Sequence, residues 1–269
     1  MLDVRPSHNP HRFTLPVTPG VCVGPPDAMF LFGGAGLGAA VAALEAATAR
    51  PAVWATAQYL SYARPPAVLD LDVTVPVAGK HSTQARVTGH VADREILTVN
   101  AALGSRPDAL TAQWPAMPAV AAPGDCPPME YNWQRADDDI NAHFEQRVAA
   151  GRYGKARTVG GPSADGHSAL WVRPVNPAAP VDRVTLALMA DFLPSGIGSA
   201  LGLHAGGNSL DNTIRYCRLV STEWVLCDIH IEAVAGGFGH GRMRLFAEDG
   251  TLLATASQSV IVRVHAPAA

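Results

Sequence analysis

Two polar residues in the second half of the chain stand in apolar surroundings, and both suit acid-base or hydrogen-bonding chemistry. Asp191 lies near the end of the apolar segment 181–193, where burial and the negative end of a helix disfavour an ionised carboxylate. Gln258 interrupts the mainly apolar segment 251–264, so its amide must find partners inside the protein or face water. Structural explanations exist for both: an acid that reaches solvent where Pro194 ends the helix, and a buried structural amide.

Residues near this pair give weaker signals. Ser209 opens a predicted strand, where a serine usually serves turn chemistry. Asp211, two residues further on, competes with Asp191 for an acidic role, and its structural alternative is to cap the preceding loop. Glycines allow loops to approach a ligand closely, although most are plain turn residues. The candidates are Gly206, Gly207, Gly236 and Gly237.

Several familiar motifs are incomplete. The glycine-rich run at 32–39 resembles a dinucleotide-binding turn, but the following segment 54–64 supplies no acidic residue for a ribose. Small residues that let a helix lie close to a sheet are the favoured interpretation. No Gly-x-Ser-x-Gly elbow is present, because Ser168 and Ser199 lack the second glycine. A hydrolase with this sequence must therefore use something other than an activated serine.

The sequence also offers no evident metal site. His230-Ile231-Glu232 lacks the Pro-Cys-x-x-Cys that follows in zinc deaminases, so we interpret His230 and Glu232 as outward-facing strand residues. The four cysteines are far apart, with no Cys-x-x-Cys pair, which predicts reduced thiols that pack in the interior. They are Cys22, Cys126, Cys217 and Cys227.

The same order of elements is predicted twice. Residues 33–49 form an Ala-rich segment typical of a helix packed on all sides, and four strands follow at 54–64, 68–77, 82–91 and 95–103. The second half begins with a buried helix at 181–193, and its strands are expected at 209–219, 224–233, 240–247 and 251–264, with a hairpin turn at 248–250. Short spacings predict antiparallel pairing.

A proline-rich connector separates the two halves. Residues 105–166 carry prolines, a polar run at 137–139 and a glycine-rich stretch at 160–166, with a short helix expected at 140–149. The predicted organisation is therefore an N-terminal unit at 1–104, a connector at 105–166 and a C-terminal unit at 167–269.

From about residue 13 to residue 263 the sequence resembles the type II acyl-CoA thioesterases. Similar stretches occur in the family's order: Phe-Thr-Leu at 13–15, Phe-Gly-Gly at 32–34, Trp-Val-Arg at 171–173 and Ala-Asp-Phe-Leu-Pro at 190–194. They continue with Ser-Leu-Asp at 209–211, Glu-Trp-Val-Leu at 223–226, Asp249-Gly250 with Leu-Ala-Thr at 253–255, and Gln258. The resemblance implies an α+β double hotdog, in which two units of a helix and an antiparallel sheet form one continuous sheet.

The resemblance also implies an active site in the C-terminal unit. The family's Asp, Thr or Ser, and Gln correspond to Asp191, Ser209 and Gln258, which would orient and deprotonate a water that attacks the thioester carbonyl without a covalent enzyme intermediate. Gly206, Gly207 and Gly236 are candidates for substrate-binding loops, and Gln58 and Asn100 for the acyl or CoA channel. Ala102 stands where a second Gln would fall, so one working site per chain is expected, and Glu45 is expected to be an exposed residue of the first helix.

Composition limits the partners. The formal charge of −3 predicts no nucleic-acid partner, and no apolar run is judged to approach the ~20 residues of a membrane span. We expect a cytoplasmic enzyme of fatty acid metabolism that needs no cofactor or metal and forms a homodimer or higher homo-oligomer through its sheet edges. Two alternatives remain open: a hotdog enoyl-thioester hydratase or dehydratase, which would need a His beside the acid, and a non-catalytic acyl-thioester binding protein.

Overall fold

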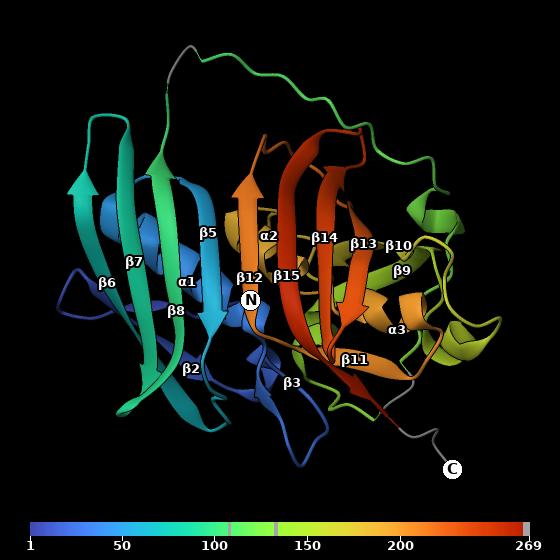
Figure 1. Cartoon of the computed structure of the whole chain (residues 1–269). Helices are drawn as coiled ribbons and strands as arrows, with labels where there is room; N and C mark the ends of the chain where they lie inside the picture. The colour runs from blue at the N-terminus through green and yellow to red at the C-terminus, as the bar shows by residue number, and fades with distance from the viewer. Residues whose placement is uncertain (107–108, 132–133, 266–269) are drawn as a thin grey trace.

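One large β-sheet runs through both halves of the chain in the computed structural model, which describes residues 1–106, 109–131 and 134–265. The sheet has 13 strands in the order β1-β2-β6-β7-β8-β5-β12-β15-β14-β13-β10-β9, with β11 paired to β15 off this path. The long helices lie together behind the sheet in the view of Figure 1. This arrangement confirms the predicted double hotdog with a continuous sheet.

The N-terminal half follows the prediction closely. Helix α1 (Gly33–Thr48) precedes β5 (Ala52–Tyr59), β6 (Ala67–Ala78), β7 (Ser82–Val91) and β8 (Arg94–Gly104). Ahead of the helix lie β1 (Arg5–Pro6), β2 (Arg12–Val17), and the separate two-stranded sheet of β3 (Cys22–Val23) and β4 (Phe30–Leu31). The glycines of α1 allow close packing, because a Cβ at Gly36 would lie 2.6 Å from Leu97 Cδ2 and one at Gly38 would lie 3.3 Å from the Val184 carbonyl oxygen. The structure thus supports the packing interpretation of the glycine-rich run.

The C-terminal half repeats this plan with one change in its helix. The elements are β10 (His167–Pro174), α2 (Arg183–Ala190), α3 (Ser195–Leu201), β11 (Ala205–Ser209), β12 (Asp211–Tyr216), β13 (Val225–Ala235), β14 (Phe238–Ala247) and β15 (Leu252–Val264). The predicted helix 181–193 was too long: Asp182 caps its start, and the regular helix stops at Ala190 before a turn leads into α3. The predicted strand 209–219 corresponds to the shorter β12, and Ser209 is instead the last residue of β11.

The two halves meet at the pairing of β5 with β12. Thr56 lies opposite Thr213 in this antiparallel ladder, and their hydroxyl oxygens are 3.0 Å apart. Behind the junction, α1 packs against α2. The buried apolar side chains of both halves form one core cluster between helices and sheet. This shared core positions the polar residues at the end of α2.

The connector adds a strand to the sheet. Its predicted helix at 140–149 was wrong: a 3₁₀ turn at Ile140–His143 leads into β9 (Phe144–Ala150), which pairs with the edge of β10. Pairing along an exposed sheet edge overrides the local preference here. Further upstream, the connector packs Met117, Val120 and Cys126 over the sheet face opposite the helices (Figure 1).

Two sequence predictions about the interior need correction. Residues Arg183–Leu201 are long and apolar enough to be a candidate membrane span, contrary to the prediction that no such run exists. In the structure this stretch is divided between α2 and α3, and 72% of its apolar window is buried inside the protein. All four cysteines are free as predicted, but Cys217 is exposed rather than packed, because it follows β12 on a surface loop.

Candidate active site

Asp191, Ser209 and Gln258 converge at the end of α2, although they are far apart in the sequence. The Ser209 hydroxyl donates to Asp191 Oδ1 at 3.1 Å. The Gln258 amide nitrogen lies 2.5 Å from the same oxygen and 2.6 Å from Ser209 Oγ. These three contacts make a closed triangle of hydrogen bonds. The structure therefore brings together all three residues that the sequence predicted as catalytic.

The second carboxylate oxygen of Asp191 is bound by the N-terminal half. The backbone N–H of Gly34, in the first turn of α1, donates to Oδ2 at 2.7 Å. Asp191 itself follows the last residue of α2, whose carbonyl end is unfavourable for an anion, whereas the N-terminal end of α1 is favourable. The ionised carboxylate is thus stabilised by a helix from the other half.

Burial dominates the electrostatics of this carboxylate. Asp191 is only 6% exposed, and its desolvation raises its pKa from 3.8 to about 6. The donors from Gln258, Gly34 and Ser209 oppose this effect because they stabilise the charged form, but they do not cancel it. A carboxyl group with a pKa near 6 is ionised at neutral pH and still basic enough to accept a proton.

A second group of polar side chains surrounds the triangle. The Tyr59 hydroxyl and the Asn212 amide are buried and have no hydrogen-bond partner among the residues that the structure describes. Nevertheless, the nearby Asn212 side chain helps to lower the pKa of Asp191, and the Asp191 charge helps to keep the pKa of Tyr59 high after desolvation. A Cβ at Gly33 would lie 2.8 Å from Asp191 Oδ2 and 3.1 Å from the Tyr59 hydroxyl. Because Gly33 has no side chain, Asp191 and the Tyr59 ring can pack closely against its backbone.

A cavity of about 420 Å³ opens from this point. Asp191, Ser209, Gly33 and Tyr59 line it, and aromatic side chains such as Phe192 form much of its wall. Gln258 is 3% exposed and does not line the cavity, so its amide acts from behind the other two residues. Among the described residues, no histidine lines the cavity.

The other sequence candidates divide into two groups. Gly206 and Gly207 on β11 line the cavity, and their contact with a ligand stays a prediction. Gly236 and Gln58 do not line it: Gly236 lies in the turn between β13 and β14 with a φ of 58°, and Gln58 is an exposed residue of β5, so their role in substrate binding stays a prediction. Strand periodicity alone does not tell which face of β5 carries Gln58.

The competing carboxylates have structural partners. Asp211 accepts a hydrogen bond from the Ser259 backbone N–H at 2.7 Å, which supports its structural role over the acidic one. Glu45 accepts from the Ala52 N–H at 2.7 Å and lies 3.7 Å from Arg183 Nε, so it is not the exposed residue that the sequence predicted. Asn100 is exposed on β8 and does not line the cavity.

Comparisons with known proteins agree with this fold. The family model named acyl-CoA thioesterase C-terminal domain matches residues 123–262. A solved structure assigned as a thioesterase, from Novosphingobium aromaticivorans, is 34% identical to this chain with a TM-score of 0.86, and the alignment covers 96% of this chain and 97% of that one. No protein with a curated description matches the sequence.

Two further solved structures share the fold at lower identity. An acyl-CoA thioesterase II from Mycobacterium marinum is 20% identical with a TM-score of 0.74, covering 98% of this chain and 97% of that one. A dehydratase domain from Pseudomonas fluorescens is 14% identical with a TM-score of 0.58, covering 92% of this chain and 93% of that one. The fold defines a double-hotdog protein. With the family match over more than half its length, the chain belongs to the acyl-CoA thioesterases.

Proposed function

We propose that this protein hydrolyses acyl-CoA with a water molecule activated by Asp191. The observation that carries the proposal is a buried carboxylate, with a pKa of about 6, that lines a cavity and is held by three donors. The water oxygen would form a bond to the thioester carbonyl carbon while its proton passes to Asp191. The C–S bond then breaks, CoA leaves as the thiol after taking up that proton, and the free fatty acid remains.

Ser209, Gln258 and Gly34 hold the base in position. Gln258 donates to both Asp191 and Ser209 from behind the cavity, which fixes their mutual orientation. Oδ1 already accepts two hydrogen bonds, whereas Oδ2 accepts one from Gly34 among the described residues. We place the attacking water beside Oδ2 in the cavity that Asp191, Ser209 and Tyr59 line.

The cavity walls indicate an acyl group as the bound part of the substrate. Its lining is mostly apolar near Phe30, Leu31 and Phe192, which suits a hydrocarbon chain. Arg157, buried and without a carboxylate partner among the described residues, lines the same cavity and provides positive charge for an anionic substrate. We propose a role in fatty acid metabolism on this basis, and a panel of acyl-CoAs from short to long chains would define the preferred length.

One experiment separates this function from its alternatives. The protein is mixed with saturated and enoyl-CoA substrates, and both free CoA and the absorbance of the enoyl group are followed. We expect release of CoA. Loss of enoyl absorbance without CoA would favour the hydratase or dehydratase, and tight binding without either change would favour a non-catalytic binding protein. No histidine among the described residues lines the cavity, which argues against the hydratase or dehydratase.

The pH dependence of hydrolysis should report the ionisation of Asp191. Because the base must be ionised, kcat/KM should rise with pH around the pKa of about 6 and level off above pH 7. At pH 5, one unit below this value, we expect about one tenth of the plateau rate. A profile that stays flat down to pH 4.5 would contradict the assignment of Asp191 as the base.

Replacing Gln258 should change this profile in a defined direction. Gln258→Met removes the donor that most lowers the pKa of Asp191 but keeps a side chain of similar length. The pKa of Asp191 should therefore rise, and the acid limb of kcat/KM should move to higher pH, with a rate at pH 6 about tenfold lower than in the wild type. An unshifted limb would mean that Gln258 does not act on the carboxylate.

Location and assembly stay proposals. Four free cysteines, three of them buried, fit a reducing cytoplasm. We also propose that copies of the chain associate through the sheet edges. The edge formed by β1 and β2 has no further strand beside it among the described residues, whereas residues 127–129 already hydrogen-bond to the outer side of β9 at the other end. Light scattering of the purified protein would measure the oligomeric state.

A further inference from the structure

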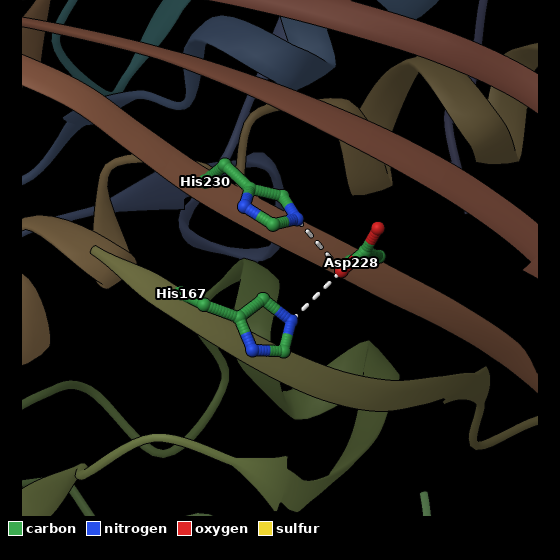
Figure 2. Close-up of side chains that lie close together, drawn as sticks. All are labelled: His167, Asp228 and His230. Carbon is green, nitrogen blue, oxygen red and sulfur yellow. Dashed lines mark hydrogen bonds and ion pairs between the residues drawn. The ribbon is translucent and has the colours of Figure 1, made fainter. Parts of the chain in front are cut away.

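A cluster of His167, Asp228 and His230 lies away from the active site, on the sheet (Figure 2). His167 on β10 stands directly opposite His230 on β13, and Asp228 precedes His230 by two residues on the same strand. Side chains two apart on a strand share a face. Ile229 and Ile231, between and beside them, belong to the core under the helices. The cluster therefore faces away from the helices, on the other side of the sheet.

The three side chains point toward one another. His167 Nε2 lies 2.9 Å and His230 Nε2 lies 3.3 Å from the same Asp228 oxygen, Oδ1. All three potential ligand atoms lie within 4.8 Å of one another. Ligand nitrogens and oxygens around a tetrahedral zinc ion, each about 2.0–2.1 Å from the metal, are about 3.3 Å apart. Small side-chain rotations would bring the cluster to that geometry.

The surroundings leave room for one open position. Asp228 is 2% exposed, so its carboxylate is held by the sheet, while about a quarter of each histidine side chain is exposed. Two imidazoles and one carboxylate with an open side suit zinc and similar divalent ions. From this geometry we infer that His167, Asp228 and His230 form a binding site for a divalent cation of the zinc class.

Neighbouring charges limit the affinity of this site. Arg244 lies opposite Asp228 and Arg242 opposite His230 on β14, and both would repel a cation. Arg242 is paired with Glu232, which reduces its effect. The site should thus be weaker than a closed four-ligand zinc site, and a water molecule would complete the coordination.

The position of the cluster defines what a bound ion would do. It would join β10 to β13, two neighbouring strands of the C-terminal half, on the face opposite the Asp191 cavity. The ion is therefore a structural link that stabilises the sheet, and it takes no part in thioester hydrolysis. This inference does not rest on the proposed catalytic mechanism, and either can fail without the other.

The sequence could not show this site because its ligands come from two strands. His230-Ile231-Glu232 was interpreted as a strand with outward-facing residues, and His230 does face outward. Glu232, however, pairs with Arg242, and the real partners of His230 are Asp228 and the distant His167. Only the antiparallel register of β10 and β13 places the two histidines together.

The test is titration of the full-length, tag-free, chelator-treated protein with Zn²⁺ in a calorimeter, and with Co²⁺ by visible absorption. We expect one equivalent of Zn²⁺, visible Co²⁺ bands of an imidazole-bound ion, and a rise in Tm of about 5 °C at a hundredfold excess over Kd. Asp228→Asn and His230→Gln should each weaken binding at least tenfold and abolish the rise in Tm.

His240→Gln is the matched control. His240 is an exposed histidine on β14 whose ring bonds to Ser259, and it lies outside the cluster. This variant should bind Zn²⁺ like the wild type. The inference would be overturned if the wild-type protein bound less than about 0.2 equivalent of Zn²⁺ at about 100 µM Zn²⁺. It would also be overturned if the Asp228→Asn and His230→Gln variants bound Zn²⁺ as tightly as the wild type. Circular dichroism of each variant without metal shows whether it is folded, and if one is not, the other carries the test.

Discussion

Asp191→Asn is expected to lower kcat for acyl-CoA hydrolysis by about 10³-fold, within the range of 10²–10⁴ that general-base catalysis contributes. The amide keeps the shape of the carboxylate but cannot take a proton from water. Substrate binding should change little, because the cavity walls that hold the acyl group are unaltered. Release of CoA measured with a thiol reagent gives the rate, and the KM or a binding assay shows whether the substrate is still held.

Asp211→Asn is the control for this variant. It removes a carboxylate of the same type nearby, one whose visible role is to accept the Ser259 N–H. We expect it to keep most of the activity. If Asp191→Asn hydrolysed acyl-CoA at the wild-type rate, or Asp211→Asn lost as much as Asp191→Asn, the assignment of the base would be wrong.

Asp191→Asn should also change how the stability of the protein depends on pH. Because the pKa of Asp191 is higher in the folded protein than its ordinary 3.8, the folded state binds the proton more tightly. The free energy of unfolding should therefore fall as pH rises from about 4 to about 6, by roughly 2 kcal/mol from this group alone. Asp191→Asn should lose this part of the pH dependence, which chemical denaturation of both proteins at pH 4.5 and 7 would measure.

Gly34→Ala is expected to damage both the fold and the activity. A Cβ at this position would lie 2.8 Å from the Leu188 carbonyl oxygen and 2.9 Å from Asp191 Cβ, and backbone cannot move aside as a flexible side chain can. Overpacking of this kind costs about 1–3 kcal/mol, partly offset by the better helix propensity of alanine. We expect Tm to fall by several degrees, and kcat to fall about tenfold as the bond from the Gly34 N–H to Asp191 lengthens.

Gly124→Ala serves as the control, since nothing lies within 4 Å of an added Cβ there and its φ needs no glycine. It should leave both Tm and kcat close to those of the wild type. If Gly34→Ala were as stable and active as this control, α1 and α2 would be less closely packed around Asp191 than the structure shows.

The sequence predicted the elements well where one periodicity governs a segment. The helix at 33–49 and the strand at 82–91 agree with α1 and β7, because small buried residues and alternating side chains leave few alternatives. The strand β9 was missed, since its pairing with β10 depends on a sheet edge far away in the sequence. Local pattern cannot report such tertiary pairing.

The site was predicted in part for a similar reason. Asp191 and Gln258 were conspicuous because each is a polar group in an apolar segment, and Ser209 joined them through the family resemblance. Gly34, Tyr59 and Asn212 were missed as neighbours of the carboxylate. Gly34 gave a signal only for packing, and the face of Tyr59 is set by the junction of β5 with β12.

The hydrogen bond from Gly34 to Asp191 links the two halves of the chain at the proposed base. The carboxylate of the C-terminal half accepts a hydrogen bond from the backbone of the N-terminal half, so neither half alone contains every group that holds the proposed base. Separately expressed fragments should be inert alone and regain turnover only when they dock, which makes activity a reporter of correct interdomain assembly.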